Sequence, residues 1–114
     1  MKDKSQLLKG TLEGCILKVI GDSETYGYEI SEKLKLAGLS EISEGTVYPL
    51  LLRLEKNALV KTELKDSPFG PKRKYYTLSE KGREELFDFY TNWKQLKYSI
   101  DFLFKDYESG DENG

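Results

Sequence analysis

The sequence predicts an α+β fold that is mainly helical and ends in one long helix. Three observations support this prediction. Apolar residues recur at helical spacing in several segments, two short β-prone segments flank a turn-rich stretch between residues 59 and 78, and a heptad pattern runs through the C-terminal third. At 114 residues the chain has the size of one domain with a modest core. We therefore expect one compact body followed by a helix that is too long for that body to cover.

The first two predicted helices form the support of the compact body. The first is expected at residues 7–20 and is ended by Gly21. Its apolar face consists of Leu8, Leu12, Cys15, Ile16, Val19 and Ile20. The second is expected at residues 25–37, with Thr25 as its cap and Gly38 as its stop. Its inward residues are expected to be Tyr28, Ile30, Leu34 and Ala37. A compact turn then leads into the third helix.

Cys15 is the single cysteine, so the chain cannot form an internal disulfide, which agrees with a reducing compartment. Two interpretations of this residue follow from the sequence. A small buried side chain is favoured, because Cys15 shares a face with apolar residues of the first helix. A redox-sensing thiol is the alternative, but no basic neighbour in the sequence would lower its pKa.

The third helix is expected at residues 43–57, with Ser43 as its N-cap. One face is apolar, with Val47, Leu50, Leu51 and Leu54. The opposite face carries Glu44, Thr46, Tyr48, Arg53 and Lys56. Gly45 leaves the first turn uncrowded, and Pro49 falls in the second turn, where a proline is tolerated. The exposed end of such a helix can enter a groove.

Two short strands are expected at residues 59–64 and 72–78, around a turn at residues 66–71. The second strand begins with three consecutive cations, Lys72, Arg73 and Lys74. Because consecutive side chains alternate across a strand, these cations are expected on both faces of a projecting hairpin. That arrangement suits a phosphate backbone.

The chain is expected to form a supporting helix, then a helix with a polar leading face, and then a basic hairpin. This order of elements predicts a winged helix-turn-helix. Four blocks then resemble the PadR family of bacterial transcriptional regulators: Tyr26-Gly27-Tyr28-Glu29-Ile30, Gly45-Thr46-Val47-Tyr48-Pro49-Leu50-Leu51, Arg53-Leu54-Glu55-Lys56-Asn57 and Gly70-Pro71-Lys72-Arg73-Lys74-Tyr75-Tyr76-Thr77-Leu78. The resemblance runs from about Gly10 to Gly82. It implies a homodimeric repressor that binds an operator through recognition helices and wings. In many members a small, often aromatic molecule releases the DNA.

By analogy with winged helices, the residues expected to contact DNA are Ser43, Glu44, Gly45, Thr46, Tyr48, Arg53, Lys72, Arg73 and Lys74. Thr46 and Glu44 would approach base edges in the major groove, and Tyr48 and Arg53 would contact phosphates. The three wing cations would hold the wing against the DNA backbone or the minor groove. Tyr48 has an alternative role in packing against the second helix. Arg53 has an alternative as a surface ion pair, which is less favoured because its neighbours at helical spacing include no acid. A dimer would present two DNA-binding domains about 34 Å apart, a spacing that fits an inverted-repeat operator.

The last helix is expected from the N-cap Ser79 onward over about 28 residues, or about 42 Å. Its apolar heptad positions, which we assign to dimerisation, are Leu86, Phe89, Trp93, Leu96, Ile100, Leu103 and Tyr107. Such a stripe needs a partner, either the first helix of the same chain, a second copy, or both. We favour a two-fold dimer, as the resemblance also implies. The predicted organisation is a DNA-binding domain at 1–78, a dimerisation helix at 79–108 and a disordered acidic tail at 109–114.

An effector site is suggested on the same helix by Phe89, Tyr90, Trp93 and Leu96. These residues could line a cavity between subunits and stack on a flat aromatic ligand. The alternative, which we favour from the pattern alone, is that Trp93 fills the dimer core. Some short PadR regulators, which this chain resembles, use a tryptophan on this helix to bind planar drugs.

Composition excludes several other classes of function. The chain has no histidine and one cysteine, so a Ser-His-Asp triad, histidine metal ligation and a multi-thiolate zinc site are excluded, and no cofactor or enzymatic activity is expected. No apolar run is long enough to span a bilayer and no signal peptide is recognisable, so a cytoplasmic protein is expected.

Charge is distributed unevenly around the net value of −2. Residues 53–83 hold nine basic and four acidic side chains, a net charge of +5. Residues 84–114 hold three basic and eight acidic side chains, a net charge of −5. Charge alone is more typical of a solvated surface, so a protein-interaction module with a winged-helix fold is the competing hypothesis. The basic wing and the polar start of the third helix favour a DNA-binding regulator.

Overall fold

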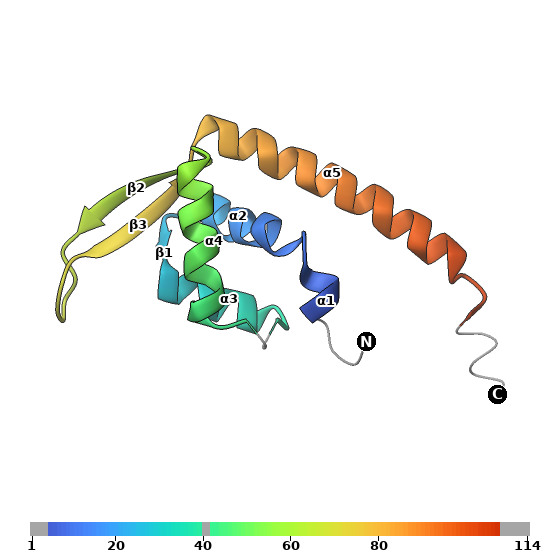
Figure 1. The fold of residues 1–114 in the computed structure, drawn as a ribbon, viewed down its shortest axis with the longest axis horizontal. Coiled ribbons are helices and arrows are strands. Elements are labelled where there is room, and N and C mark those ends of the chain that lie inside the picture. Colours follow the sequence, from blue (N-terminus) through green and yellow to red (C-terminus); the bar gives the residue numbers. More distant parts are fainter. Residues whose placement is uncertain (1–4, 40–41, 108–114) are drawn as a thin grey trace.

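The protein forms a winged-helix head from which one long helix projects (Figure 1). The computed structural model describes residues 5–39 and 42–107. Its elements in chain order are α1 (Ser5–Leu8), α2 (Leu12–Asp22), β1 (Thr25–Tyr26), α3 (Gly27–Leu36), α4 (Glu44–Lys56), β2 (Val60–Lys65), β3 (Arg73–Leu78) and α5 (Glu80–Leu103). The predicted fold class is therefore confirmed.

The strands form one antiparallel sheet in the order β1-β3-β2. β2 and β3 are the two arms of the wing, which projects from the head on the side away from the far end of α5 (Figure 1). Their register runs from Val60 opposite Leu78 to Lys65 opposite Arg73. The short strand β1 pairs with the outer edge of β3, with Thr25 opposite Tyr76. This pairing ties the wing to the start of α3.

The core lies where α2, α3 and α4 meet the base of the wing. Its most completely buried apolar side chains are Ile16, Ile20, Ile30, Val47, Leu51 and Leu54. They come from the apolar faces that helical periodicity predicts for these segments. Leu59, Tyr76 and Leu78 extend the core into the sheet. The three helices are thereby fixed relative to the wing.

The expected first helix is interrupted. Gly10 has a φ of 84°, in the left-handed region that glycine adopts without a steric penalty, and Thr11 donates its N–H to the carbonyl of Leu8 at 3.0 Å. The periodic pattern continues across this break, so spacing alone predicted one helix. Two shorter helices, α1 and α2, are the result.

The start of the second helix also differs from the prediction. Thr25 lies in β1 rather than at a helix cap, and its hydroxyl donates to Glu29 at 2.6 Å. Tyr26 occupies the N-cap position of α3. Strand pairing with β3 therefore outweighs the local capping preference of a threonine. Of the expected inward residues, Tyr28 and Ala37 are exposed.

α5 begins as predicted but ends early. Ser79 is its N-cap and accepts a hydrogen bond from the Gly82 N–H at 2.9 Å. The helix ends at Leu103 after 24 residues, about 36 Å, so Tyr107 lies beyond it and does not continue the heptad stripe. The last turn contains Asp101 and no basic residue, a poor match to the negative end of the helix dipole. The predicted tail, 109–114, lies outside the described residues.

Candidate nucleic-acid interface

One face of α4 packs against the core, and the opposite face is exposed to solvent. Val47, Leu51 and Leu54 are buried against the core. The outer face is largely exposed and mostly polar, with Glu44, Thr46, Tyr48, Arg53 and Lys56 beside the apolar Leu52. Pro49 lies in the second turn of the helix, as expected from its position in the sequence. The first turns of α4 are therefore accessible to a large partner.

The beginning of α4 is open rather than tightly capped. Ser43 has the extended backbone of an N-cap, with φ −111° and ψ 167°, but its hydroxyl accepts no hydrogen bond from a helix amide. It lies instead 3.4 Å from the hydroxyl of Thr46. A Cβ added to Gly45 would meet only the Ser43 hydroxyl, at 3.6 Å. The end of the helix is thus uncrowded, and its first amides are not capped by the Ser43 side chain.

Tyr48 fulfils part of each of its two expected roles. Its ring packs on the start of α3, where a Cβ added to Gly27 would lie only 2.5 Å from Cε1 of the ring. Even so, 44% of Tyr48 remains exposed. Burial raises the pKa of its hydroxyl above the usual value, and the nearby Glu44 carboxylate raises the pKa further. Tyr48 therefore stays a neutral hydrogen-bond donor at the edge of the free face.

The three wing cations are not equivalent. Lys72 is exposed, and no ion pair of it is found among the described residues. The Arg73 guanidinium lies over the ring of Tyr26, 4.4 Å from its centroid. Lys74 turns back toward α4, where its Nζ is 2.6 Å from Oε1 of Glu55. Lys74 is consequently less available to DNA than the sequence suggested.

Arg53 also has an acidic partner. Its Nε lies 3.2 Å from Oε1 of Glu13, which belongs to α2. The absence of acids at helical spacing in α4 was therefore a poor guide, because the counter-charge comes from another helix. The pair is largely exposed on the arginine side, so it is weak and exchangeable.

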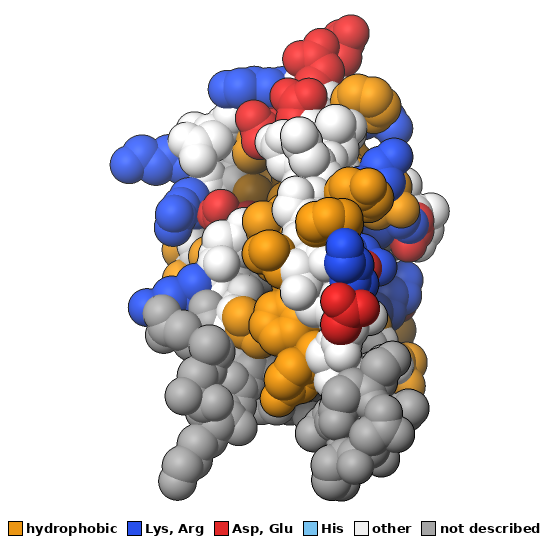
Figure 2. Space-filling model, turned by 90° about the vertical axis from the view of Figure 1, so that its right-hand side faces the viewer, with side chains coloured by type: hydrophobic (Ala, Val, Ile, Leu, Met, Phe, Trp, Pro, Cys, Tyr) orange, Lys and Arg blue, Asp and Glu red, His pale blue; other side chains and the backbone are white. Residues whose placement is uncertain are grey.

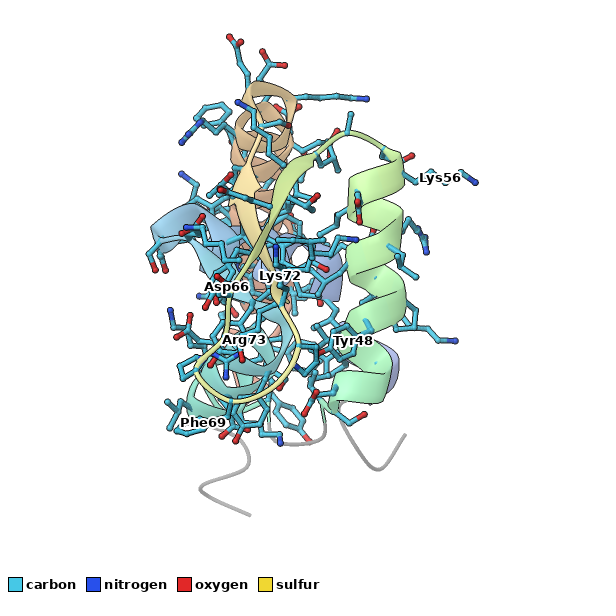
Figure 3. All side chains as sticks on the ribbon, turned by 90° about the vertical axis from the view of Figure 1, so that its left-hand side faces the viewer. Tyr48, Lys56, Asp66, Phe69, Lys72 and Arg73 are labelled. Carbon is cyan, nitrogen blue, oxygen red and sulfur yellow. The ribbon has the colours of Figure 1, made fainter. Side chains whose placement is uncertain are left out.

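A shallow hollow of about 380 Å³ joins the wing to α4. Its lining residues are Tyr26, Gly27, Tyr48, Leu52, Lys72, Arg73, Lys74 and Tyr76. Figure 3 shows Lys72 and Arg73 on the wing with Tyr48 on the neighbouring helix, and Phe69 at the tip of the hairpin. The hollow combines hydroxyl donors with cations, which is a chemistry suited to phosphate groups.

Tyr26, Tyr76 and Glu55 were not among the predicted site residues. Tyr26 supports Arg73, Tyr76 lines the hollow, and Glu55 holds Lys74. The alternation of Tyr75 and Tyr76 along a strand could have indicated that one of them faces α4. No local pattern could have paired Glu55 with a residue nineteen positions away.

α5 carries a second surface, and its two halves differ. Near its start, Leu86 packs against the core, and the ring of Phe89 occupies the space that a side chain at Gly14 of α2 would need. Beyond this contact the predicted stripe is exposed, as for Trp93, Leu96, Ile100 and Leu103. Figure 2, which views this end of the molecule, shows hydrophobic side chains gathered on the surface. Among the described residues, only the near half of α5 packs against the rest of the chain.

An apolar groove of about 770 Å³ lies between α2, the end of α3 and the near half of α5. Phe89, Tyr90 and Trp93 line it together with Cys15. Leu96, the fourth residue of the predicted effector site, lies further along α5 and does not line the groove. Burial raises the pKa of the Cys15 thiol, which agrees with a packing role rather than a reactive one.

The fold and its free surfaces define a winged-helix protein with a polar recognition helix and a long C-terminal helix. None of the described helices is both long and apolar enough to cross a membrane. Residues 16–88 match the transcriptional regulator PadR-like family. The chain belongs to this family, whose members are transcriptional regulators and not enzymes.

Similar structures include a PadR-like transcriptional regulator from Bacillus cereus, with 49% identity and a TM-score of 0.80 over 88% of this chain and 97% of the other. A Streptococcus transcriptional regulator has 44% identity and a TM-score of 0.78, over 87% and 97% of the two chains. Bacillus subtilis PadR in complex with operator DNA has 26% identity and a TM-score of 0.62, covering 68% of this chain and 45% of the other. An uncharacterized protein from Lysinibacillus sphaericus is 32% identical over 92% of this chain and 98% of its own length.

Proposed function

We propose that this protein is a homodimeric transcriptional repressor that binds duplex DNA at an inverted-repeat operator. The observation that supports this most directly is that Tyr48 of α4 and the cations of the wing line one hollow, and that the turn of α4 just before Tyr48 is uncrowded. The related Bacillus subtilis PadR is seen in complex with operator DNA. Both surfaces would then lie on one duplex.

In this proposal α4 enters the major groove with its first turn. Thr46 and Glu44 approach base edges, and Gly45 permits close contact of the backbone. Ser43, Tyr48 and Lys72 contact phosphates. Arg53, Arg73 and Lys74 reach phosphates only by leaving their present partners, so their contribution to affinity is smaller than that of Lys72.

A gel shift with the DNA upstream of the protein's own gene, at two salt concentrations, tests this role. A sequence-specific regulator keeps one preferred fragment as salt rises. Arg73→Ala should weaken binding to all fragments, whereas Thr46→Ala should change the preference among them. Loss of every retained band, or equal effects of both variants on every fragment, would favour the competing protein-interaction module.

The proposed dimer forms through α5. The far half of this helix presents Trp93, Leu96, Ile100 and Leu103 to solvent. A second copy related by two-fold symmetry would cover this stripe and set two heads on one face of the DNA. Sedimentation velocity at micromolar concentration measures this directly, and a purely monomeric protein would contradict the proposal.

Effector release is proposed to use the apolar groove beside Phe89, Tyr90 and Trp93, extended by Leu96 in the dimer. Its volume of about 770 Å³ is within the range of sites for drug-sized ligands. Trp93 is 39% exposed in the single chain and is the only tryptophan in the sequence. Titration with planar aromatic compounds should therefore quench its fluorescence. An unchanged signal across such a panel would leave Trp93 as a packing residue of the dimer.

A further inference from the structure

The tip of the wing carries an exposed aromatic residue that the proposed function has not used. Phe69 is 90% exposed, the highest value among the large hydrophobic residues described. It lies in the turn that joins β2 and β3, at the tip of the hairpin (Figure 3). Turns of this kind are normally polar, because an apolar side chain there gains nothing in the folded chain. We propose that Phe69 enters the minor groove of the bound DNA and makes an apolar contact there.

The backbone around Phe69 is constrained, which restricts the direction in which the side chain leaves the turn. Pro68 and Pro71 flank the Phe69-Gly70 pair, and each proline fixes its own φ. Gly70 has a φ of 110°, which the turn requires and which other residues rarely adopt. The strand pairing ends at Lys65 opposite Arg73, so the tip stands on a paired base. A preorganised tip loses little conformational entropy on binding.

The surrounding charges favour a nucleic acid as the partner. Lys72 and Arg73 follow the tip directly, and Lys65 lies at its base. Lys65 is held by Glu24 at 2.6 Å, which leaves Lys72 as the freest cation of this set. A flat apolar ring beside cations matches the minor groove, which is about 6 Å wide and bordered by phosphates. Proteins that bind there commonly insert apolar side chains beside their basic ones.

This inference rests on the proposed DNA-binding function and adds a contact that is independent of charge. Phe69→Ala is expected to weaken binding to the preferred fragment about tenfold. The salt dependence of binding should stay unchanged, because no phosphate contact is lost. Lys72→Ala should instead reduce the salt slope. Because Phe69 is almost fully exposed, the variant should unfold at the same temperature as the parent.

Leu36→Ala is the matched control, because Leu36 is 88% exposed and lies at the end of α3, away from the wing. It should bind DNA like the parent protein. Replacing guanine by inosine in the fragment removes the amino group from the minor groove. We expect this to tighten binding of the parent and to have no effect on Phe69→Ala.

Two results would overturn the inference while leaving the proposed function intact. One is unchanged affinity of Phe69→Ala in conditions where Lys72→Ala binds more weakly. The other is an equal response of the parent and of Phe69→Ala to inosine. Failure of the parent protein to bind any fragment would contradict the proposed function itself.

Discussion

The reading surface and the far half of α5 are both left uncovered by the fold, but they differ in chemistry. The reading surface, formed by the outer face of α4 and the wing, is polar, and most of its cations are already engaged by acids or by an aromatic ring. The far half of α5 is an apolar stripe. Interactions of the first kind weaken with salt, and those of the second do not. The two surfaces can therefore be perturbed separately.

The largest effect is expected from a charge placed in the stripe. Ile100→Glu should weaken self-association by more than about 100-fold, because a dimer would bury an unpaired carboxylate. Gln95→Glu introduces the same charge on the same helix outside the heptad stripe and should have little effect. Sedimentation equilibrium over a concentration series gives both constants. Equal behaviour of the two variants would show that the stripe is not the interface.

Salt should separate the two surfaces in the parent protein. Raising the salt concentration from about 50 to 200 mM is expected to weaken DNA binding roughly 100-fold, because a dimer would make about four phosphate contacts. Self-association over the same range should be unchanged. Fluorescence anisotropy of labelled DNA and sedimentation measure the two constants. A dimer that dissociates as salt rises would contradict the apolar interface.

The wing lysines sharpen the description of the reading surface. Lys72→Ala should weaken DNA binding roughly tenfold, because this exposed cation is available to phosphate. Lys74→Ala should weaken binding less than about threefold, since Lys74 is already paired with Glu55. Its main effect should be a loss of at most about 1 kcal/mol of stability. Equal losses of affinity would mean that Lys74 leaves Glu55 when DNA binds.

The smallest effect concerns Tyr76, a buried residue of the wing strand β3 that lies near α4. Burial raises the pKa of its hydroxyl to about 12, with smaller contributions from Glu55 and Tyr48. The folded protein therefore keeps this proton at pH values where the unfolded chain has lost it. Stability should be fully present below about pH 10 and fall toward pH 12. Between about pH 10 and pH 12, the free energy of unfolding of Tyr76→Phe should fall by about 1 kcal/mol less than that of the parent protein, as measured by urea denaturation.

Sequence reasoning identified the elements better than their ends. The apolar faces of α2 and α4 and the N-cap Ser79 were predicted because each depends on neighbours within one or two helical turns. The break at Gly10 was missed because the hydrophobic spacing continues across it. The position of Thr25 in β1 was missed because its strand partner, Tyr76, lies 51 residues away. Local patterns do not contain such information.

The amino-acid sequence by itself determined the order of the elements, the polar face of α4, the basic wing and the apolar stripe of the last helix. These follow from side-chain periodicity and local charge, which need no knowledge of the fold. Only the tertiary structure decided which cations are free, because Glu13 and Glu55 reach theirs from other elements. It likewise decided how far α2 covers α5, since that depends on close packing of Phe89 at Gly14 and of Leu86 near Gly21. Contacts between distant segments are set by packing, and packing is fixed by the whole chain together.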